Sequence, residues 1–261
     1  MTDPEVREPR LDEPHEFLDT QAIHERLAHI AAHLERLTDT PLKEPAWLRR
    51  TAEEPRIPVI VAILCAIGLQ FVVPVNLAFS PRWLMPALEL LLLVAIIAFR
   101  QTAMDRTAKL VRWLGIALVT ALSFATAWSA VHLARAIIGG DTAANAGVLL
   151  RNGAAIWLTN VIAFALWYWE IDRGGPVQRA RGTHKHTDFL FSQMTAPELV
   201  PADWEPGFVD YFYLSFTNAT AFSPTDTLPL SRWAKLTMML QSAISLLTVA
   251  LVVARAVNIL H

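Results

Sequence analysis

The chain contains a single cysteine among its 261 residues, and it carries almost no net charge. One thiol cannot close a disulfide within the chain, and Cys65 stands inside an apolar run, where a small packing residue is expected. The formal net charge of −2 at pH 7 offers no basic excess that would attract a phosphate backbone. The sequence therefore predicts no intramolecular disulfide and no nucleic-acid partner.

The residue patterns of common enzymes are missing as well. There is no His-Glu-x-x-His, no Gly-x-Ser-x-Gly, no Walker loop and no dinucleotide-binding glycine fingerprint. Two histidine pairs, His29 with His33 and His184 with His186, have spacings at which imidazoles can hold zinc or copper, but nothing completes a ligand set. We therefore expect solvated histidines, no metal site, no cofactor and no enzymatic activity.

Long apolar runs dominate what is present. The chain is 54% hydrophobic, and its runs approach the ~20 residues that a helix needs to cross ~30 Å of hydrocarbon. Tryptophans near the ends of these runs would form an aromatic belt. The sequence predicts an all-α membrane protein with about five transmembrane helices and one re-entrant segment. The expected spans are residues 57–79, 83–99, 111–138, 148–169 and 233–260.

Polar and apolar stretches divide the chain into several parts. Apolar residues recur every three or four positions from Ile23 to Leu37, which predicts either a short coiled coil in an oligomer or an amphipathic helix on the membrane. The expected parts are a disordered tail at 1–15, this helix at 16–38, a linker at 39–56, four transmembrane helices within 57–170, a polar loop at 171–205, and a pore-like segment with the last span at 206–261.

The C-terminal part has a distinctive order of residues. Ser215-Phe216 and Thr220 precede a five-residue slot, Asp226 and Pro229 follow it, and Val253-Ala254-Arg255 stand near the end of the last span. This order resembles the pore loop and inner helix of tetrameric potassium channels. Together with the Trp169–Pro176 string, it also resembles bacterial multi-pass membrane proteins that have no assigned activity. The resemblance implies a homo-oligomer, a tetramer if channel-like, in the bacterial cytoplasmic membrane.

The filter slot itself departs from the channel pattern. A potassium filter points successive backbone carbonyls inward, and it uses glycines to reach the required backbone angles. Here Ser223 and Thr225 occupy the two glycine places, and Pro224 fixes its own φ and removes an amide donor. We therefore expect a hydroxyl-lined, non-potassium-selective pore for monovalent cations, or a closed relic. The pore-like residues are Thr217, Thr220, Ala221, Phe222, Ser223, Pro224, Thr225 and Asp226.

The charges of the loops conflict with a channel orientation. Cations outnumber acids between the second and third spans, at residues 100–112, which places that loop in the cytoplasm. The first 56 residues show no signal-peptide core, so we expect the N-terminal segment on the same side. Residues 171–205 are then cytoplasmic too, whereas potassium channels insert their pore loop from outside. The re-entrant segment is then inverted, or one span is miscounted, or the tail is translocated, and an inverted or otherwise non-channel arrangement is favoured over a translocated tail.

Several polar residues interrupt the expected spans. Glu89 lies inside the second span, where an acid costs roughly 2.5–3.5 kcal/mol unless it faces a partner or a wet cavity. It predicts either an ion or proton site or a structural pair with Arg135 or Arg151. Both arginines stand near span ends, where long basic side chains usually reach the headgroups. Asn160 and Gln241 are expected to form hydrogen bonds between helices.

Three functions remain open at this point. The first is a channel-like pore in which Asp226 carboxylates draw cations. The second is a non-conducting membrane scaffold or regulator that keeps a pore-like fold. The third is a small-solute transporter, which Glu89 and a helix broken at Ser223-Pro224 would suit, although no internal repeat is evident.

Overall fold

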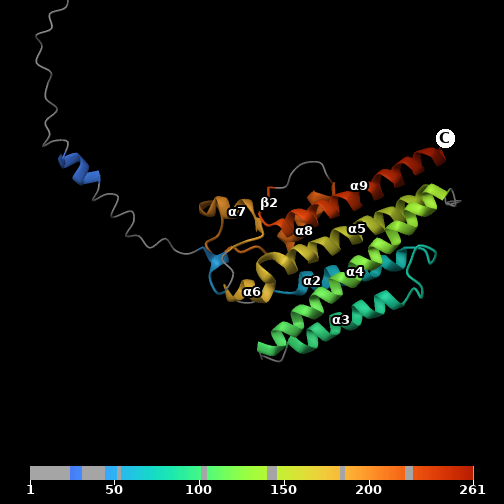
Figure 1. Ribbon diagram of the computed structural model, residues 1–261, viewed down its shortest axis with the longest axis horizontal. Coiled ribbons are helices and arrows are strands. Elements are labelled where there is room, and N and C mark those ends of the chain that lie inside the picture. The colour runs from blue at the N-terminus through green and yellow to red at the C-terminus, as the bar shows by residue number, and fades with distance from the viewer. Residues whose placement is uncertain are drawn as a thin grey trace, which may run out of the picture. The chain divides into compact units, whose positions relative to one another are not determined.

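Figure 1 shows a computed structural model of the protein, which describes residues 24–30, 45–51, 54–100, 105–139, 146–182, 186–220 and 226–260. The chain divides into two units, Met1–Glu44 and Pro45–His261. In the first unit, residues 24–30 form a helix whose side chains are exposed. The rest of the helix expected at 16–38, the tail at 1–15 and linker residues 39–44 lie outside the described residues.

The second unit is mostly helical. Its longer helices are α2 (Ile57–Val72), α3 (Leu84–Arg100), α4 (Asp105–Gly139), α5 (Ala146–Ile171), α8 (Phe208–Thr220) and α9 (Arg232–Leu260). The short elements are α6 (Pro176–Arg181), α7 (Ser192–Thr195), and 3₁₀ turns at Ala46–Leu48, Asp172–Gly174 and Pro197–Leu199. The strands β1 (Phe189–Leu190) and β2 (Leu228–Pro229) form one antiparallel pair.

Three helices are long and apolar enough to cross a membrane, which indicates a multi-pass membrane protein. They cover Lys109–Gly139, Ala146–Arg181 and Arg232–Asn258. The helices α2 and α3 are apolar but shorter, with 16 and 17 residues. The described part of the chain therefore contains three candidate spans by length, where the sequence predicts about five.

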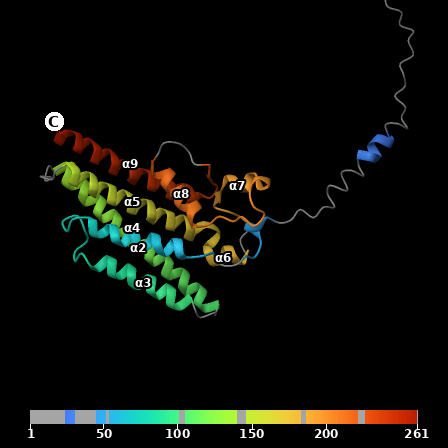
Figure 2. The same cartoon turned by 180° about the vertical axis from the view of Figure 1, so that it is seen from behind.

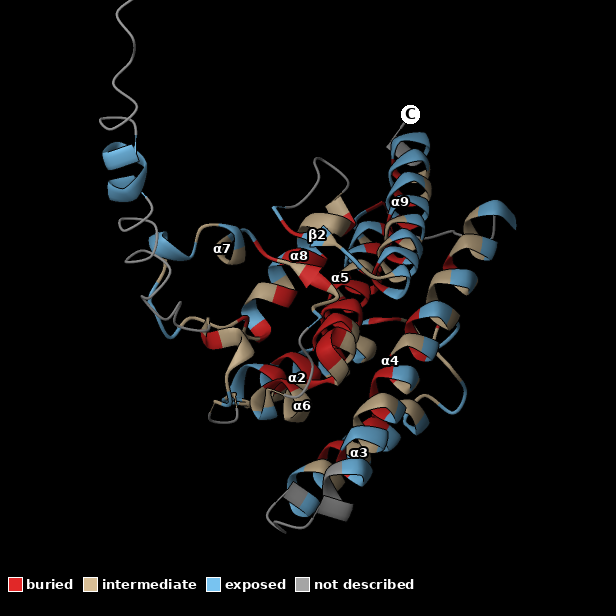
Figure 3. Cartoon of the chain, turned by 60° about the vertical axis from the view of Figure 1, so that its left-hand side comes forward, coloured by how far each residue is buried: buried red, intermediate tan, exposed pale blue. Residues whose placement is uncertain are grey.

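The helix α5 lies at the centre of the bundle. It packs against α2, α4, α8 and α9, while α3 packs mainly against α4 (Figures 1 and 2). Its residues from Val161 to Leu166 are all buried, as expected for a helix that is apolar on every side. Figure 3 shows the buried residues gathered along α5, whereas much of α3 and α9 is exposed. The exposed residues of α9 include Leu236, Leu240 and Leu247, which suits a helix that faces lipid or another copy.

The predicted first span of residues 57–79 is too long. The helix α2 ends at Val72, and Val73 is extended because the residue before a proline avoids the helical region. The chain then turns at Pro74. Farther along, Phe79 packs edge-on against Trp128 of α4, with ring centroids 5.1 Å apart. The apolar residues after Pro74 therefore cover α4 rather than extending a transmembrane helix.

Candidate functional site

A buried cluster of polar side chains joins α5, α8 and α9. Its centre is Gln241 of α9, which has no exposed surface. The Gln241 Oε1 atom accepts hydrogen bonds from Tyr168 Oη of α5 at 2.5 Å and from Asn218 Nδ2 of α8 at 2.8 Å. Its Nε2 atom donates to the backbone oxygen of Ser215 at 2.9 Å and to the Ser215 hydroxyl at 2.7 Å. Both polar atoms of Gln241 are therefore bonded within the chain.

The end of α8 is held by side chains of α9. The last carbonyls of a helix have no partner in the helix itself. Here Ser242 Oγ donates to the Asn218 carbonyl at 3.2 Å, and Ser245 Oγ donates to the Ala219 carbonyl at 2.6 Å. These serines lie about 15–20 Å along α9 from its start at Arg232, near half the thickness of a hydrocarbon core. The helix α8 therefore stops about half-way along α9.

The start of α8 is also capped. Asp210 Oδ2 accepts the Gly207 N–H at 2.8 Å, a reach from the third helical residue back to the residue before the helix, as in a capping box. The next amide, that of Phe208, donates to Glu54, a residue near the start of α2. Glu54 in turn accepts Trp169 Nε1 of α5 at 2.7 Å. The segment therefore begins at the carboxyl end of α5.

The chain returns to this same end after α8. The strand β2 pairs with β1, and the Leu230 N–H donates to the Asp188 carbonyl at 2.8 Å. The Asp188 N–H donates to Asp172 Oδ1 at 2.9 Å, and Asp172 directly follows α5. Figure 1 shows α8 and β2 near α6 and α7, at the start of α9. Phe208 and Leu230 thus lie at the same end of the bundle.

A charged cluster fixes that end. The fully buried Asp172 carboxylate accepts the Tyr211 hydroxyl at 2.6 Å and pairs with Arg173 Nε at 3.3 Å. Burial raises the pKa of Tyr211 well above its usual value, so this phenol stays a neutral donor. Arg179 Nη1 donates to the carbonyls of Trp169 at 2.5 Å and Asp172 at 3.0 Å. The partner of Asp172 on α8 is therefore Tyr211.

The pore-like residues occupy several environments. The Thr217 hydroxyl donates to the Tyr213 and Leu214 carbonyls, and the Thr220 hydroxyl donates to the Thr217 carbonyl at 2.8 Å. Both threonines therefore bond to α8 itself. Asp226 is exposed. The slot Ala221–Thr225 lies outside the described residues.

The intramembrane polar candidates do not converge on one site. Glu89 is fully buried and accepts Gln70 Nε2 of α2 at 2.6 Å, while its Oε1 atom has no hydrogen-bond partner among the described residues. The expected alternative partners, Arg135 and Arg151, are both exposed, so a pair with either one is wrong. Asn160 is buried, but no described residue bonds its Nδ2 atom. Among these candidates, Gln241 alone belongs to the cluster between α5, α8 and α9.

The sequence did not predict three hydrogen-bond partners of Gln241, namely Tyr168, Ser215 and Asn218. Asn218 stands three residues after Ser215, so both lie on one face of α8, and this spacing was a usable signal. Tyr168 reads as an interfacial aromatic residue, and nothing in the sequence joins it to Gln241. Within the described residues, no group of three His, Cys, Asp or Glu side chains could hold a metal ion.

Comparisons with known proteins add no family assignment. No family model, no curated protein and no solved structure matches this chain. Any likeness to potassium channels therefore depends on the residues and contacts described above.

Proposed function

We propose that the protein is a channel-like membrane protein in which α8 and the loop after it form a re-entrant pore segment. The observation that carries this proposal is the end of α8, whose carbonyls bond to Ser242 and Ser245 half-way along α9. A helix that stops inside hydrocarbon needs such partners, because no water reaches its last carbonyls. With 13 residues, α8 is about 20 Å long and too short to cross ~30 Å.

The helices around α8 support the same arrangement. In this proposal α5 is the outer helix, α8 the pore helix and α9 the inner helix, and the buried cluster at Gln241 joins all three. The helices α2 and α3 complete five crossings, with lengths of about 24 and 26 Å that fit a slightly thinned or locally adapted bilayer. A stripe on α8 at Val209, Tyr213 and Phe216 is exposed in the single chain. In an oligomer, the neighbouring copy covers this stripe.

The charge distribution favours an inverted pore. The start of α8 lies beside Arg173 and Arg179, and the cations Arg49, Arg56 and Lys109 belong to elements that start at the same end. By the positive-inside rule this end is cytoplasmic, so the re-entrant segment enters from the cytoplasm. We therefore propose a cation pore in the bacterial cytoplasmic membrane that is not selective for potassium and that opens toward Asp226 on the cytoplasmic side.

Conductance measurements test the pore. Purified protein in planar bilayers should pass monovalent cations in discrete steps, and Asp226→Asn should lower the unitary conductance by about twofold or more, because a ring of carboxylates concentrates cations at a pore mouth. The matched control is Asp203→Asn, which removes an exposed acid from the polar loop. Equal loss in both variants would show that surface charge in general, rather than Asp226, sets the conductance.

One observation favours a second candidate, a non-conducting scaffold. The polar atoms of Gln241 are all bonded within one chain, so they leave no donor or acceptor for an ion. A scaffold should show no single-channel current in planar bilayers, although crosslinking or native mass measurement finds intact oligomers. That result would replace the pore proposal with the scaffold.

A further inference from the structure

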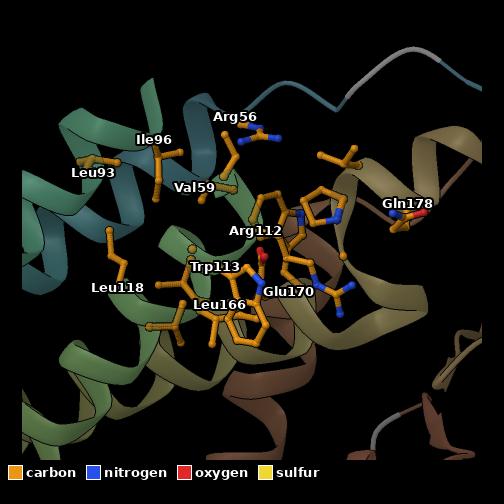
Figure 4. A pocket seen from close by; sticks show the side chains of 18 of the residues that line it. Arg56, Val59, Leu93, Ile96, Arg112, Trp113, Leu118, Leu166, Glu170 and Gln178 are labelled. Atoms are coloured by element: carbon orange, nitrogen blue, oxygen red, sulfur yellow. The ribbon is translucent and has the colours of Figure 1, made fainter. Parts of the chain in front are cut away.

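A cavity of about 660 Å³ lies where α2, α3, α4, α5 and α6 meet (Figure 4). Its size falls within the ~300–1,000 Å³ of small-molecule sites. The inner walls are apolar and come from four of the helices. They include Val59 and Ile63 of α2, Ile96 of α3, Leu118 of α4 and Leu166 of α5. An apolar chain would therefore fit the inner part of the cavity.

The outer part of the same cavity is cationic. Arg56 stands just before α2, Lys109 and Arg112 lie on α4, and Arg181 ends α6. Lys109 and Arg112 are both exposed and lie three residues apart, so they share one face of α4. Guanidinium and ammonium groups in such a cluster bind phosphate oxygens with charge-assisted hydrogen bonds.

Glu170 is the one acid among the described residues that line the cavity. Its side chain is nearly covered, and a Cβ atom added to Gly115 of α4 would stand 3.1 Å from Glu170 Oε1. The lining therefore has one acid against the four cations Arg56, Lys109, Arg112 and Arg181, and it keeps an excess of positive charge.

The depth of the cavity matches a membrane interface. Lys109 is the first residue of the candidate span Lys109–Gly139, and Trp113 one turn later is 68% exposed. Tryptophan prefers the headgroup level, and cations that attract anionic lipids lie at that level on the cytoplasmic side. The cationic opening then stands at the headgroups, and the apolar walls extend toward the acyl chains.

We propose that this cavity is a binding site for an anionic phospholipid. Arg56, Lys109 and Arg112 bind the phosphate diester, and one acyl chain lies along Ile60, Ile96 and Leu118. A free phosphate ion would leave the apolar walls without a partner, and a zwitterionic headgroup would bring its own cation toward the basic opening. The chemistry of the lining therefore selects a lipid with net negative charge.

Native mass spectrometry of the full chain in detergent tests this site with phosphatidylglycerol and phosphatidylcholine of equal chain length. The wild-type protein should bind phosphatidylglycerol more tightly than phosphatidylcholine. The double variant Lys109→Gln with Arg112→Gln should weaken that binding by about 30-fold, since each cation near a membrane surface contributes about 1 kcal/mol toward an anionic lipid. Binding of phosphatidylcholine should fall less, because its choline cation already offsets the attraction of its phosphate to the basic opening.

The matched control is the double variant Arg232→Gln with Lys235→Gln, which removes two exposed cations from the start of α9. It changes the net charge equally but does not touch the cavity, so binding should resemble that of the wild type. Equal losses in the two double variants would overturn the proposal, because they would reflect general surface charge. No preference between the two lipids would overturn it as well.

A second variant tests the acyl-chain part of the cavity. Ile96→Phe narrows the apolar part of the cavity without changing its charge. It should therefore weaken the binding of long-chain phosphatidylglycerol and leave the binding of dihexanoyl phosphatidylglycerol unchanged. Inorganic phosphate at millimolar concentration should not displace the long-chain lipid. Displacement by phosphate, together with no effect of chain length, would show a site for a soluble anion and contradict the lipid. None of these outcomes depends on conduction, so the proposal of a lipid site and the proposal of a pore can be disproved separately.

Discussion

At the scale of single residues, Gln241 has the largest structural role in the site. It lies within α9, and its amide joins Tyr168, Ser215 and Asn218 from two other helices. Burying an amide without hydrogen-bond partners is costly. Gln241 therefore stabilises the fold only because both of its polar atoms are hydrogen-bonded. The neighbouring Ser242 makes longer hydrogen bonds, at 3.1 and 3.2 Å, to Asn218. Substitutions of Gln241 and Ser242 therefore compare the loss of several short hydrogen bonds with the loss of two longer ones.

Replacing Gln241 with leucine should lower the free energy of unfolding by about 2–3 kcal/mol, because it removes the hydrogen bonds to Ser215 and Asn218 and leaves the fully buried Tyr168 hydroxyl without an acceptor. Unfolding in mixed micelles of increasing SDS content measures this change. The control, Ser242→Ala, should cost only about 0.5 kcal/mol, the usual value for a hydrogen bond between membrane helices. Similar small losses in both variants would mean that the cluster relaxes around the missing amide.

At the scale of elements, α5 and α9 approach closely at Gly153. A Cβ atom at this position would stand 2.7 and 2.9 Å from the two methyl groups of Val252. Real contacts are never so short, and valine is stiff, so one helix would have to move. Small residues commonly allow such approach between membrane helices, where van der Waals packing drives association. Gly153 therefore sets the spacing of the two helices that hold α8.

Gly153→Ala should destabilise the protein by about 1–3 kcal/mol through overpacking, and Val252→Ala in the same chain should restore most of the loss. The control is Gly68→Ala on α2, where nothing lies within 4 Å of the added atom. That variant should be neutral or more stable by about 0.5–1 kcal/mol, because alanine favours a helix over glycine. Unfolding in SDS compares the three chains, and failure of Val252→Ala to restore stability would exclude the proposed steric cause.

At the scale of the whole molecule, several short polar elements meet at one end of the helix bundle. The carboxyl end of α5, the strands β1 and β2, and the start of α8 meet around Asp172. The turn after α2, with Asn76, belongs to the other end, because α2 runs away from Glu54 and α3 returns. The two ends therefore provide markers for the two sides of the membrane.

Labelling of single cysteines in intact cells should separate these sides. In a Cys65→Ser background, Asp203→Cys and Asp226→Cys should react with a membrane-impermeant maleimide only after the cells are opened, since both exposed positions are proposed to be cytoplasmic. Asn76→Cys, exposed in the turn after α2, should react in intact cells. Reaction of Asp226→Cys in intact cells would contradict the inverted pore and favour the orientation of potassium channels.

Particular residues show where prediction from the sequence ends. The apolar runs place α4, α5 and α9 because hydropathy is local, and a separate 13-residue helix forms at Phe208–Thr220. The end of α2 was missed although Pro74 marks it, because the apolar run continues through the turn. For Glu89 the sequence left open an ion or proton site and a pair with Arg135 or Arg151, whereas its hydrogen-bond partner is Gln70 on the adjacent α2. Pairing between helices depends on their rotation and depth, which a single sequence does not encode locally.

The sequence by itself determined the class of this protein, because the length and hydropathy of each helix depend only on nearby residues. It also determined that the slot at 221–225 lacks the glycines of a selective filter. The tertiary structure alone decided that Phe208 and Leu230 lie at one end of the bundle, and that Gln241, Ser242 and Ser245 bond to α8. These contacts join residues 20 or more positions apart. They form only when packing brings α5, α8 and α9 together in a medium that leaves no carbonyl to water.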